Sequence, residues 1–268
     1  MKAHLALIGF GEAARAFSGA GVWGGFARAY DIRPLESVYS KCSITGCASL
    51  AEAVAGAGVI ISLVTADQAL LAARGVAESL VDEPLFLDMN SVAPESKRSA
   101  CEAIAAAGGR YVDAAIMAPV YPAQLSVPVL LSGPDAAEGK AVLEELGFSD
   151  VQVVGSEIGR ASTIKMLRSV FYKGMEALTA ECLIACARAG VEDEVVASFG
   201  AGWSEQANYR LDRMLVHGAR RAAEMREAAK TLRSLGVEPL LTTGTIKRQD
   251  ALGALDCDPV PPGFTDKL

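Results

Sequence analysis

A run of polar side chains recurs at helical spacing just past the middle of the sequence. At about 100° per residue, these side chains fall on one stripe of a helix whose other residues are largely apolar. Such a stripe is typical of groups that face an internal cleft; the alternative is the solvent-facing stripe of an ordinary amphipathic helix. The residues on the stripe are Ser162, Lys165, Ser169, Tyr172, Lys173 and Glu176.

Lys165 is the residue on this stripe whose chemistry suits proton transfer. When a hydride leaves an alcohol carbon, the hydroxyl oxygen must lose its proton, and the reverse reaction returns that proton. Partial burial lowers the pKa of a lysine and brings its amine into the range where it exchanges protons. The sequence therefore predicts Lys165 as a general acid/base, with Ser169, one turn later, orienting the same oxygen. Arg168 and Tyr172 are the predicted substrate contacts from this segment.

A glycine-rich turn at residues 9–14 directly follows an apolar run at residues 5–8. Gly9 allows a tight turn, Gly11 lets the backbone approach a pyrophosphate closely, and Ala14 is small enough to pack against the strand. The helix that opens there offers free N–H groups and a favourable dipole to phosphates. We therefore predict a nicotinamide dinucleotide as cofactor, bound by Gly9, Phe10, Gly11, Glu12, Ala13 and Ala14.

An acidic residue, Asp31, ends the second predicted strand at residues 26–30. A carboxylate at this place can hydrogen-bond the adenosine ribose and repels a 2′-phosphate, which favours NAD over NADP. Arg33 leaves NADP open, because a nearby arginine can accommodate a 2′-phosphate. Both residues are predicted to contact the cofactor. The alternative for Asp31 is a turn-forming residue ahead of Pro34.

Polar residues also follow two later strands, which are predicted at residues 59–64 and 84–88. Open α/β sheets present ligands at the carboxyl ends of their strands, and Ser91 lies just beyond such an end. We predict a role for Ser91 in catalysis and substrate binding; the alternative is an N-cap for the helix that begins near Pro94. The predicted cofactor contacts in these segments are Val64, Thr65 and Asn90.

Strand and helix patterns alternate over the first part of the chain. The alternation predicts a parallel sheet with helices on both faces, in a Rossmann-type α/β domain over residues 1–156. Only helical patterns follow, which predicts an all-α C-terminal domain over residues 157–268 and a ligand cleft between the two domains. The other predicted strands span 110–113, 127–131 and 151–154; the predicted helices span 12–20, 49–55, 67–80, 94–107, 135–146, 159–189, 193–199, 208–235 and 247–255.

The bulk composition narrows the classes of partner. The 268 residues are 51% hydrophobic and 21% charged, which is typical of a globular protein rather than a disordered one. A formal net charge of −7 argues against a nucleic-acid partner, and no apolar run approaches the roughly 20 residues of a membrane span. With 2 histidines and no Cys-x-x-Cys pair, we expect no metal site. We predict a cytoplasmic protein that acts on a small molecule.

The order of these motifs resembles the β-hydroxyacid dehydrogenase superfamily, which includes 3-hydroxyisobutyrate, tartronate semialdehyde and 6-phosphogluconate dehydrogenases. By this resemblance, residues 9–14 are the cofactor loop, and residues 88–94 resemble the family's Asp-x-Ser-Thr-x-x-Pro segment. Residues 113–119 occupy the place of the substrate-binding loop. Residues 159–169 resemble the Gly-x-x-x-Lys-x-x-Asn region, which implies the catalytic role for Lys165.

The chain departs from this family in three segments. In the substrate loop, Met117, Ala118 and Pro119 stand where the family has Ser-Gly-Gly, and a proline has no N–H to donate. We still expect these three residues to contact the substrate. The family's asparagine is replaced by Ser169, and its C-terminal Lys-Asp pair has no clear equivalent. Residues 217–225 instead resemble a branch of the superfamily with a short helical C-terminal domain and mostly unassigned substrates.

One helical face in that C-terminal segment is rich in arginine. Its residues, by their three- and four-residue spacings, are Arg213, His217, Arg220, Arg221 and Glu224. Such a face binds a carboxylate or phosphate through a bidentate arginine, or is simply solvated or paired with its own glutamates. His217 and Arg221 are the predicted substrate contacts here. The family resemblance also implies a homodimer formed through the helical domain.

Together these features predict reversible hydride transfer between NAD or NADP and a small hydroxy acid or related polar alcohol. One alternative keeps the nicotinamide but reduces a C=N bond, as in imine reductases of similar architecture. A further alternative is a non-catalytic protein that senses the dinucleotide. The retained Lys165 and its polar stripe argue against this last alternative.

Overall fold

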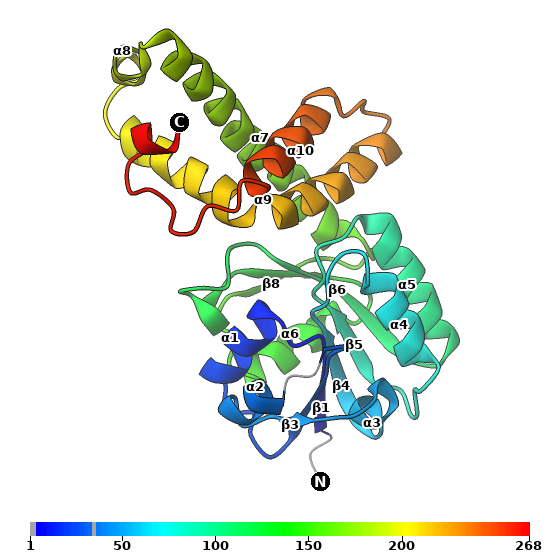
Figure 1. Ribbon diagram of the computed structural model, residues 1–268. Helices are drawn as coiled ribbons and strands as arrows, with labels where there is room; N and C mark the ends of the chain where they lie inside the picture. Colours follow the sequence, from blue (N-terminus) through cyan, green and yellow to red (C-terminus); the bar gives the residue numbers. More distant parts are fainter. Residues whose placement is uncertain (1–3, 34–35) are drawn as a thin grey trace. The chain divides into compact units, whose positions relative to one another are not determined.

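The computed structural model describes residues 4–33 and 36–268 (Figure 1). The chain forms two compact units, Met1–Lys165 and Met166–Leu268. The division falls inside helix α7 (Arg160–Ala189), which therefore begins in the first unit and continues into the second. In the described ranges, no helix is long and apolar enough to cross a membrane.

The first unit is built on a single mixed sheet. Among its described residues, an eight-stranded sheet has the order β3-β2-β1-β4-β5-β6-β7-β8. The inner strands carry apolar residues on both faces, as expected for strands that are covered by helices on both sides. The strands are β1 (His4–Ile8), β2 (Ala27–Tyr30), β3 (Thr45–Gly46), β4 (Ala57–Ser62), β5 (Leu85–Asp88), β6 (Arg110–Ile116), β7 (Val129–Ser132) and β8 (Val151–Gly155).

Strand β7 runs against β6, whereas the other neighbouring strands are parallel. A parallel connection needs a crossover, usually a helix that carries the chain back to the other end of the sheet. The segment between β6 and β7 contains only the 3₁₀ turn η1 (Gln124–Ser126), so the chain re-enters the sheet at the end it left. The predicted α/β fold is therefore confirmed, and the prediction of a wholly parallel sheet is wrong at this strand.

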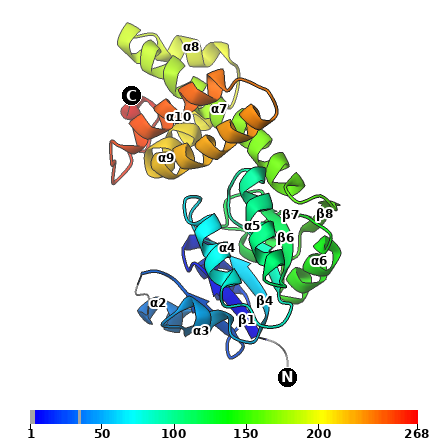
Figure 2. The ribbon, with the colours of Figure 1, turned by 90° about the vertical axis from the view of Figure 1, so that its right-hand side faces the viewer.

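Helices cover both faces of the sheet. Leu5 and Leu7 of β1 belong to one buried cluster, and Ala6 and Ile8 belong to the other, as the two-residue period of a strand requires. Figure 2 shows α4 and α5 lying on the second face. The first cluster includes residues of α1 (Glu12–Ala20), α2 (Glu36–Lys41) and α6 (Ala136–Glu145); the second includes α3 (Leu50–Val54), α4 (Ala69–Ala77) and α5 (Pro94–Ala106).

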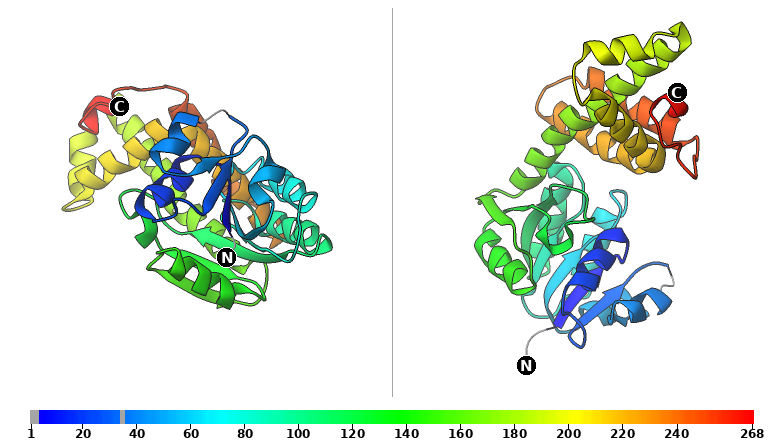
Figure 3. Two further views of the ribbon diagram at one scale, coloured as in Figure 1. Left: turned by 90° about the horizontal axis from the view of Figure 1, so that it is seen from below. Right: turned by 90° about the vertical axis from the view of Figure 1, so that its left-hand side faces the viewer.

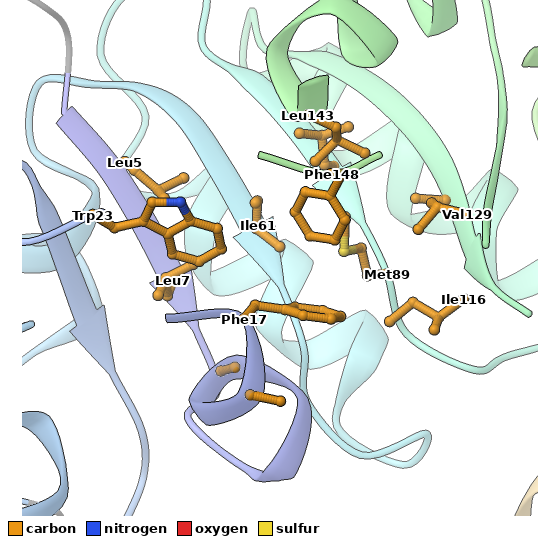
Figure 4. Packing of buried hydrophobic residues seen from close by; sticks show 14 of the residues in the cluster. Leu5, Leu7, Phe17, Trp23, Ile61, Met89, Ile116, Val129, Leu143 and Phe148 are labelled. Carbon is orange, nitrogen blue, oxygen red and sulfur yellow. The ribbon is translucent and has the colours of Figure 1, made fainter. Parts of the chain in front are cut away.

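Aromatic side chains anchor the first cluster (Figure 4). The rings of Phe17 and Phe148 meet edge to face with centroids 4.9 Å apart, and the ring of Trp23 lies 6.4 Å from Phe148. The indole N–H of Trp23 donates to the Leu146 carbonyl at 2.9 Å, so the polar end of this buried side chain is satisfied. These contacts tie the end of α1 to the end of α6 on one face of the sheet.

The second unit consists of the rest of α7 and the helices that follow it. Helix α9 (Trp203–Ser234) packs side by side with α10 (Leu240–Gly253), as Figure 3 shows, and α8 (Glu192–Ser198) lies between α7 and α9 in the sequence. The predicted all-α character of this region is confirmed. Its last turn is η2 (Thr265–Lys267).

Candidate functional site

The turn after β1 has the geometry of a phosphate-binding loop. Gly9 has a φ of +86°, and a Cβ at this position would lie 2.7 Å from the Leu63 carbonyl oxygen. Gly11 precedes α1 without a side-chain cap, and nothing lies within 4 Å of the place a Cβ would take. The backbone at Gly11 is therefore open to a ligand at a helix N-terminus, where N–H groups attract phosphate. These residues fit a dinucleotide pyrophosphate.

Asp31 connects this turn to the end of β2. Its Oδ2 accepts the Phe10 N–H at 2.8 Å, and its Oδ1 accepts both the N–H and the Nε–H of Arg33 at 3.0 and 3.2 Å. The Asp31 side chain is 7% exposed, whereas Arg33 is 62% exposed. Burial raises the pKa of Asp31, but the hydrogen bonds from Arg33 and Phe10 outweigh it and hold that pKa below its ordinary value. Asp31 thus holds the cofactor loop at Phe10 and the segment after β2 at Arg33. Pro34, which the alternative interpretation of Asp31 as a turn residue involves, lies outside the described residues.

Asn90 ties together the carboxyl ends of β4 and β5. Its Oδ1 accepts the Val64 N–H at 2.7 Å, and its Nδ2 donates to the Ser62 hydroxyl at 2.9 Å. Asn90 itself is buried, and Thr65, the next residue after Val64, is exposed. The three predicted cofactor residues Val64, Thr65 and Asn90 therefore lie in one connected group of loops at the edge of the sheet where α/β proteins bind ligands.

Ser91 does not cap the helix that follows it. The residue before α5 is Ala93, and α5 has no side-chain cap. The Ser91 Oγ is buried and has no hydrogen-bond partner in the part of the chain that the structure describes. The alternative of an N-cap is therefore wrong, and an unsatisfied buried hydroxyl is left at the end of β5, which is a feature of ligand sites.

A buried charged cluster, which the sequence analysis does not predict, lies beside these loops. Lys97 on α5 is 0% exposed, and its Nζ lies 3.0 Å from the Asp88 Oδ1 and 3.4 Å from the Asp113 Oδ1. The Tyr111 hydroxyl donates to the Asp88 Oδ2 at 2.6 Å. Burial and the neighbouring Asp88 carboxylate raise the pKa of Tyr111 well above its ordinary value, so this phenol stays protonated. The available signal was the spacing of Lys97, which shares one helix face with apolar Ala100 and Ile104.

Helix α7 carries two of the predicted catalytic residues, Lys165 and Ser169. Lys165 is half-buried on its second turn, and Ser169 is buried one turn later. Ser162, Lys173 and Glu176 are also buried, so the solvent-facing alternative is wrong for most of the polar stripe. Tyr172 departs from the stripe: it is 52% exposed. The guanidinium of Arg168, also exposed, stacks over the Tyr172 ring at 4.3 Å.

The second unit pairs the remaining polar residues of α7 with α9. Lys173 Nζ donates to the Ser169 Oγ at 3.2 Å and forms an ion pair with the Glu224 Oε2 at 2.6 Å. Because an ammonium group only donates, the Ser169 oxygen is the acceptor in this bond. The hydroxyl proton of Ser169 is therefore not used in the bond to Lys173.

Glu176 forms an ion pair with Arg221, which the sequence predicted as a substrate contact. Arg221 pairs with both carboxylate oxygens of Glu176, its Nε at 3.1 Å, and Gln249 Nε2 donates to the same carboxylate at 3.0 Å. His217, the other predicted substrate contact on α9, is half-buried. Burial, together with the neighbouring cations of Arg221 and Arg220, lowers the pKa of Arg213.

The predicted substrate loop has few backbone donors to offer. The Met117 N–H donates to the Pro128 carbonyl at 2.8 Å, which continues the antiparallel pairing of β6 and β7. Ala118 and Pro119 are exposed, and Pro119 has no N–H. Two of the three positions that hold Ser-Gly-Gly in the family therefore offer no free backbone N–H here. The Met117 N–H is bonded within the sheet, and Pro119 has none.

Comparison with known proteins identifies both parts of the chain. Residues 26–155 match the NAD binding domain of 6-phosphogluconate dehydrogenase, and residues 187–252 match a domain of unknown function, DUF1932. A conserved hypothetical protein from Sinorhizobium meliloti 1021 is 34% identical, with a TM-score of 0.77 over 100% of this chain and 97% of that chain. The match to the NAD-binding domain confirms the predicted cofactor class.

Two less similar structures share the fold. Mycobacterium tuberculosis 3-hydroxyisobutyrate dehydrogenase with L-serine is 17% identical, with a TM-score of 0.78 over 100% of this chain and 98% of that chain. An imine reductase from Streptomyces aurantiacus is 18% identical, with a TM-score of 0.58 over 98% of both chains. At these identities the similarity extends to the fold and not to the substrate.

Proposed function

This chain belongs to the 6-phosphogluconate dehydrogenase-like superfamily of β-hydroxyacid dehydrogenases, and we propose that it oxidises a small hydroxy acid or related polar alcohol reversibly, with Lys165 as general acid/base. It is an NAD(P)-dependent oxidoreductase of the hydroxyacid dehydrogenase type. A nicotinamide ring, when bound, would supply the hydride acceptor. The proposal concerns the residues that handle the substrate and its proton.

The half-buried Lys165 on α7 is the observation that carries this proposal. In alcohol oxidation, its neutral amine takes the hydroxyl proton as the carbon loses hydride; in the reverse direction, its ammonium returns that proton. Ser169 lies one helical turn away, with its oxygen already accepting a hydrogen bond from Lys173. We assign Ser169 the task of donating its own proton to the substrate oxygen, which holds that oxygen near Lys165.

Cofactor choice is proposed from the end of β2. The Asp31 carboxylate repels a 2′-phosphate. Arg33, the residue that could accommodate such a phosphate, already donates a hydrogen bond to Asp31. We therefore propose NAD as the preferred cofactor. A preference for NADP of about tenfold in kcat/KM, or about 1.4 kcal/mol, would contradict this assignment.

The experiment is a substrate screen on the wild-type protein and on Lys165→Met. Hydroxy acids, with 3-hydroxyisobutyrate among them, and sugar acids are offered with NAD and NADP separately, and reduced dinucleotide is followed by absorbance. We expect Lys165→Met to lose roughly 10²–10⁴-fold in turnover, the range for a general acid/base, while dinucleotide binding measured by calorimetry is retained. Turnover of Lys165→Met at the wild-type rate would refute the role of this lysine.

Imine reduction is the second candidate, and the substrate loop favours it. The Met117 N–H is engaged within the sheet and Pro119 has no N–H, so this loop has lost donors that would hold a carboxylate. A cyclic imine, 2-methyl-1-pyrroline, is offered beside the hydroxy acids with reduced dinucleotide. Imine turnover without alcohol oxidation would favour this candidate, and binding of dinucleotide with no turnover of either class would favour a sensing protein.

A further inference from the structure

The start of α7 is capped by side chains from distant parts of the chain. The residue before the helix is Gly159, which has a φ of +99° and no side chain to satisfy the first N–H groups. Instead, the Ala161 N–H donates to the Ser132 Oγ and the Ser162 N–H donates to the Asp113 Oδ2, both at 3.0 Å. The position of the first turn of α7 is therefore set by the sheet.

The two capping residues face each other across the antiparallel pair. Asp113 of β6 and Ser132 of β7 are register partners, and the Ser132 hydroxyl donates to the Asp113 Oδ2 at 3.2 Å. Both are 0% exposed. A carboxylate at the N-terminus of a helix of 30 residues is also favoured by the helix dipole. The antiparallel register of β7 places Ser132 directly opposite Asp113.

Lys97 links this cap to the loop of Ser91. Its ammonium lies 3.4 Å from the Asp113 Oδ1 and 3.0 Å from the Asp88 Oδ1, and Asp88 in turn accepts the Asn90 N–H at 2.9 Å. One buried cation therefore holds both the helix that carries Lys165 and the loop that carries Asn90 and Ser91. Apolar replacements of buried ion clusters are often as stable, so stability alone does not account for this cluster.

We propose that Lys97, Asp113 and Ser132 are positioning residues that set the place of Lys165. This inference rests on the proposed function, in which Lys165 handles the substrate proton. Lys165 follows Ser162 by three residues, and each residue of a helix turns by about 100° and rises about 1.5 Å. Loss of the cap would let the first turn unwind, and the amine of Lys165 would change both its direction and its surroundings.

The test reads the environment of Lys165 without a substrate. The folded protein is labelled sparingly with acetic anhydride from about pH 7 to pH 11, which brackets the ordinary lysine pKa of about 10.4. The labelling rate of Lys165 is obtained by peptide mass spectrometry, with the exposed Lys230 as internal reference. The variants are Ser132→Ala and Asp113→Asn; the control is Ser49→Ala, which removes the serine cap of α3.

We expect Ser132→Ala and Asp113→Asn each to shift the titration midpoint of Lys165 by roughly half a pH unit, or about threefold in rate at fixed pH. Ser49→Ala should lower the unfolding midpoint without moving Lys165. An unchanged Lys165 profile in both cap variants would overturn the proposal. If Asp113→Asn does not fold, Ser132→Ala decides the question alone, because it removes one hydroxyl and leaves the carboxylates paired with Lys97. Since no turnover is measured, failure here is separate from failure of the Lys165→Met assay.

Discussion

Gly9 and Gly11 stand two residues apart in the same loop, yet their backbones permit different substitutions. Gly9 has a φ of +86° and touches the backbone of Leu63, so Gly9→Ala should lower the free energy of unfolding by about 1–3 kcal/mol. Gly11 has a φ of −78° and open space around it, so Gly11→Ala should leave that free energy within about 0.5 kcal/mol of wild type. Urea unfolding measures both.

Dinucleotide binding should respond to Gly11→Ala even though the fold does not. A methyl group at this position stands where the pyrophosphate would approach the backbone, and we expect NAD affinity to fall about tenfold, or about 1.4 kcal/mol. Calorimetric titration with NAD measures this. Wild-type affinity in Gly11→Ala would show that the phosphates bind elsewhere.

Asp31 should make stability depend on pH in the acid range. Its pKa is lower in the folded protein than in the unfolded chain, where it is about 3.9. Its carboxylate therefore stabilises the fold fully above about pH 4, and this contribution is lost as the pH falls through the folded-state pKa. We expect the difference in unfolding free energy between wild type and Asp31→Asn to be constant from neutral pH to about pH 4 and to shrink below that. A difference that grows on acidification would contradict the assignment.

Helices α9 and α10 are held close by two glycines. A Cβ at Gly218 would lie 2.6 Å from the Gly253 Cα, and backbone cannot move aside as a side chain can. Gly218→Ala should therefore lower the free energy of unfolding by about 1–3 kcal/mol, the usual effect of overpacking. Gly174→Ala on α7 is the matched control, since nothing lies within 4 Å of its Cβ. That substitution should stabilise the protein by about 0.8–1.0 kcal/mol through helix propensity.

The elements with strong periodic patterns were predicted well, and the short ones were not. The strands β1, β4 and β5 and the long helix α7 follow the predicted ranges closely. The helix α2 and the two-residue strand β3 were missed, because so few residues carry no measurable period. Helix α10 begins at Leu240, earlier than the predicted residue 247, because α10 packs against α9 and buries Thr242 and Thr245 despite the low helix propensity of threonine.

The C-terminal tail is more ordered than its composition suggests. Its proline content by itself favours a loosely ordered segment from residue 258. In the structure, Phe264 and Leu268 pack against the buried cluster of the second unit. Lys267 forms an ion pair with Asp212 at 2.6 Å. Composition contains no information about these distant partners.

At the scale of the whole molecule, we expect a homodimer formed through the second unit. Phe171 and Leu178, which lie seven residues apart and thus on one face of α7, are 63% and 68% exposed. Light scattering should give about twice the 27.9 kDa of one chain. Leu178→Glu should halve this mass, whereas Val22→Glu, at an exposed position in the first unit, should not. A wild-type mass of one chain would contradict the prediction.

The sequence by itself determined the features that depend on local period and residue type. Glycine spacing after a strand predicted the cofactor loop, alternation of strands and helices predicted the α/β fold, and the polar stripe predicted Lys165 as the general acid/base. These signals are local because steric limits on the backbone and the periods of helix and strand act over a few residues.

Only the tertiary structure decided which polar groups meet. It paired Lys97 with Asp88 and Asp113, paired Arg221 with Glu176, and placed Ser132 of β7 where it caps α7. Each of these pairings joins residues far apart in the chain. A buried charge must find a partner because desolvation is costly, but residue types do not say which of several partners the packing of helices and strands will bring within reach.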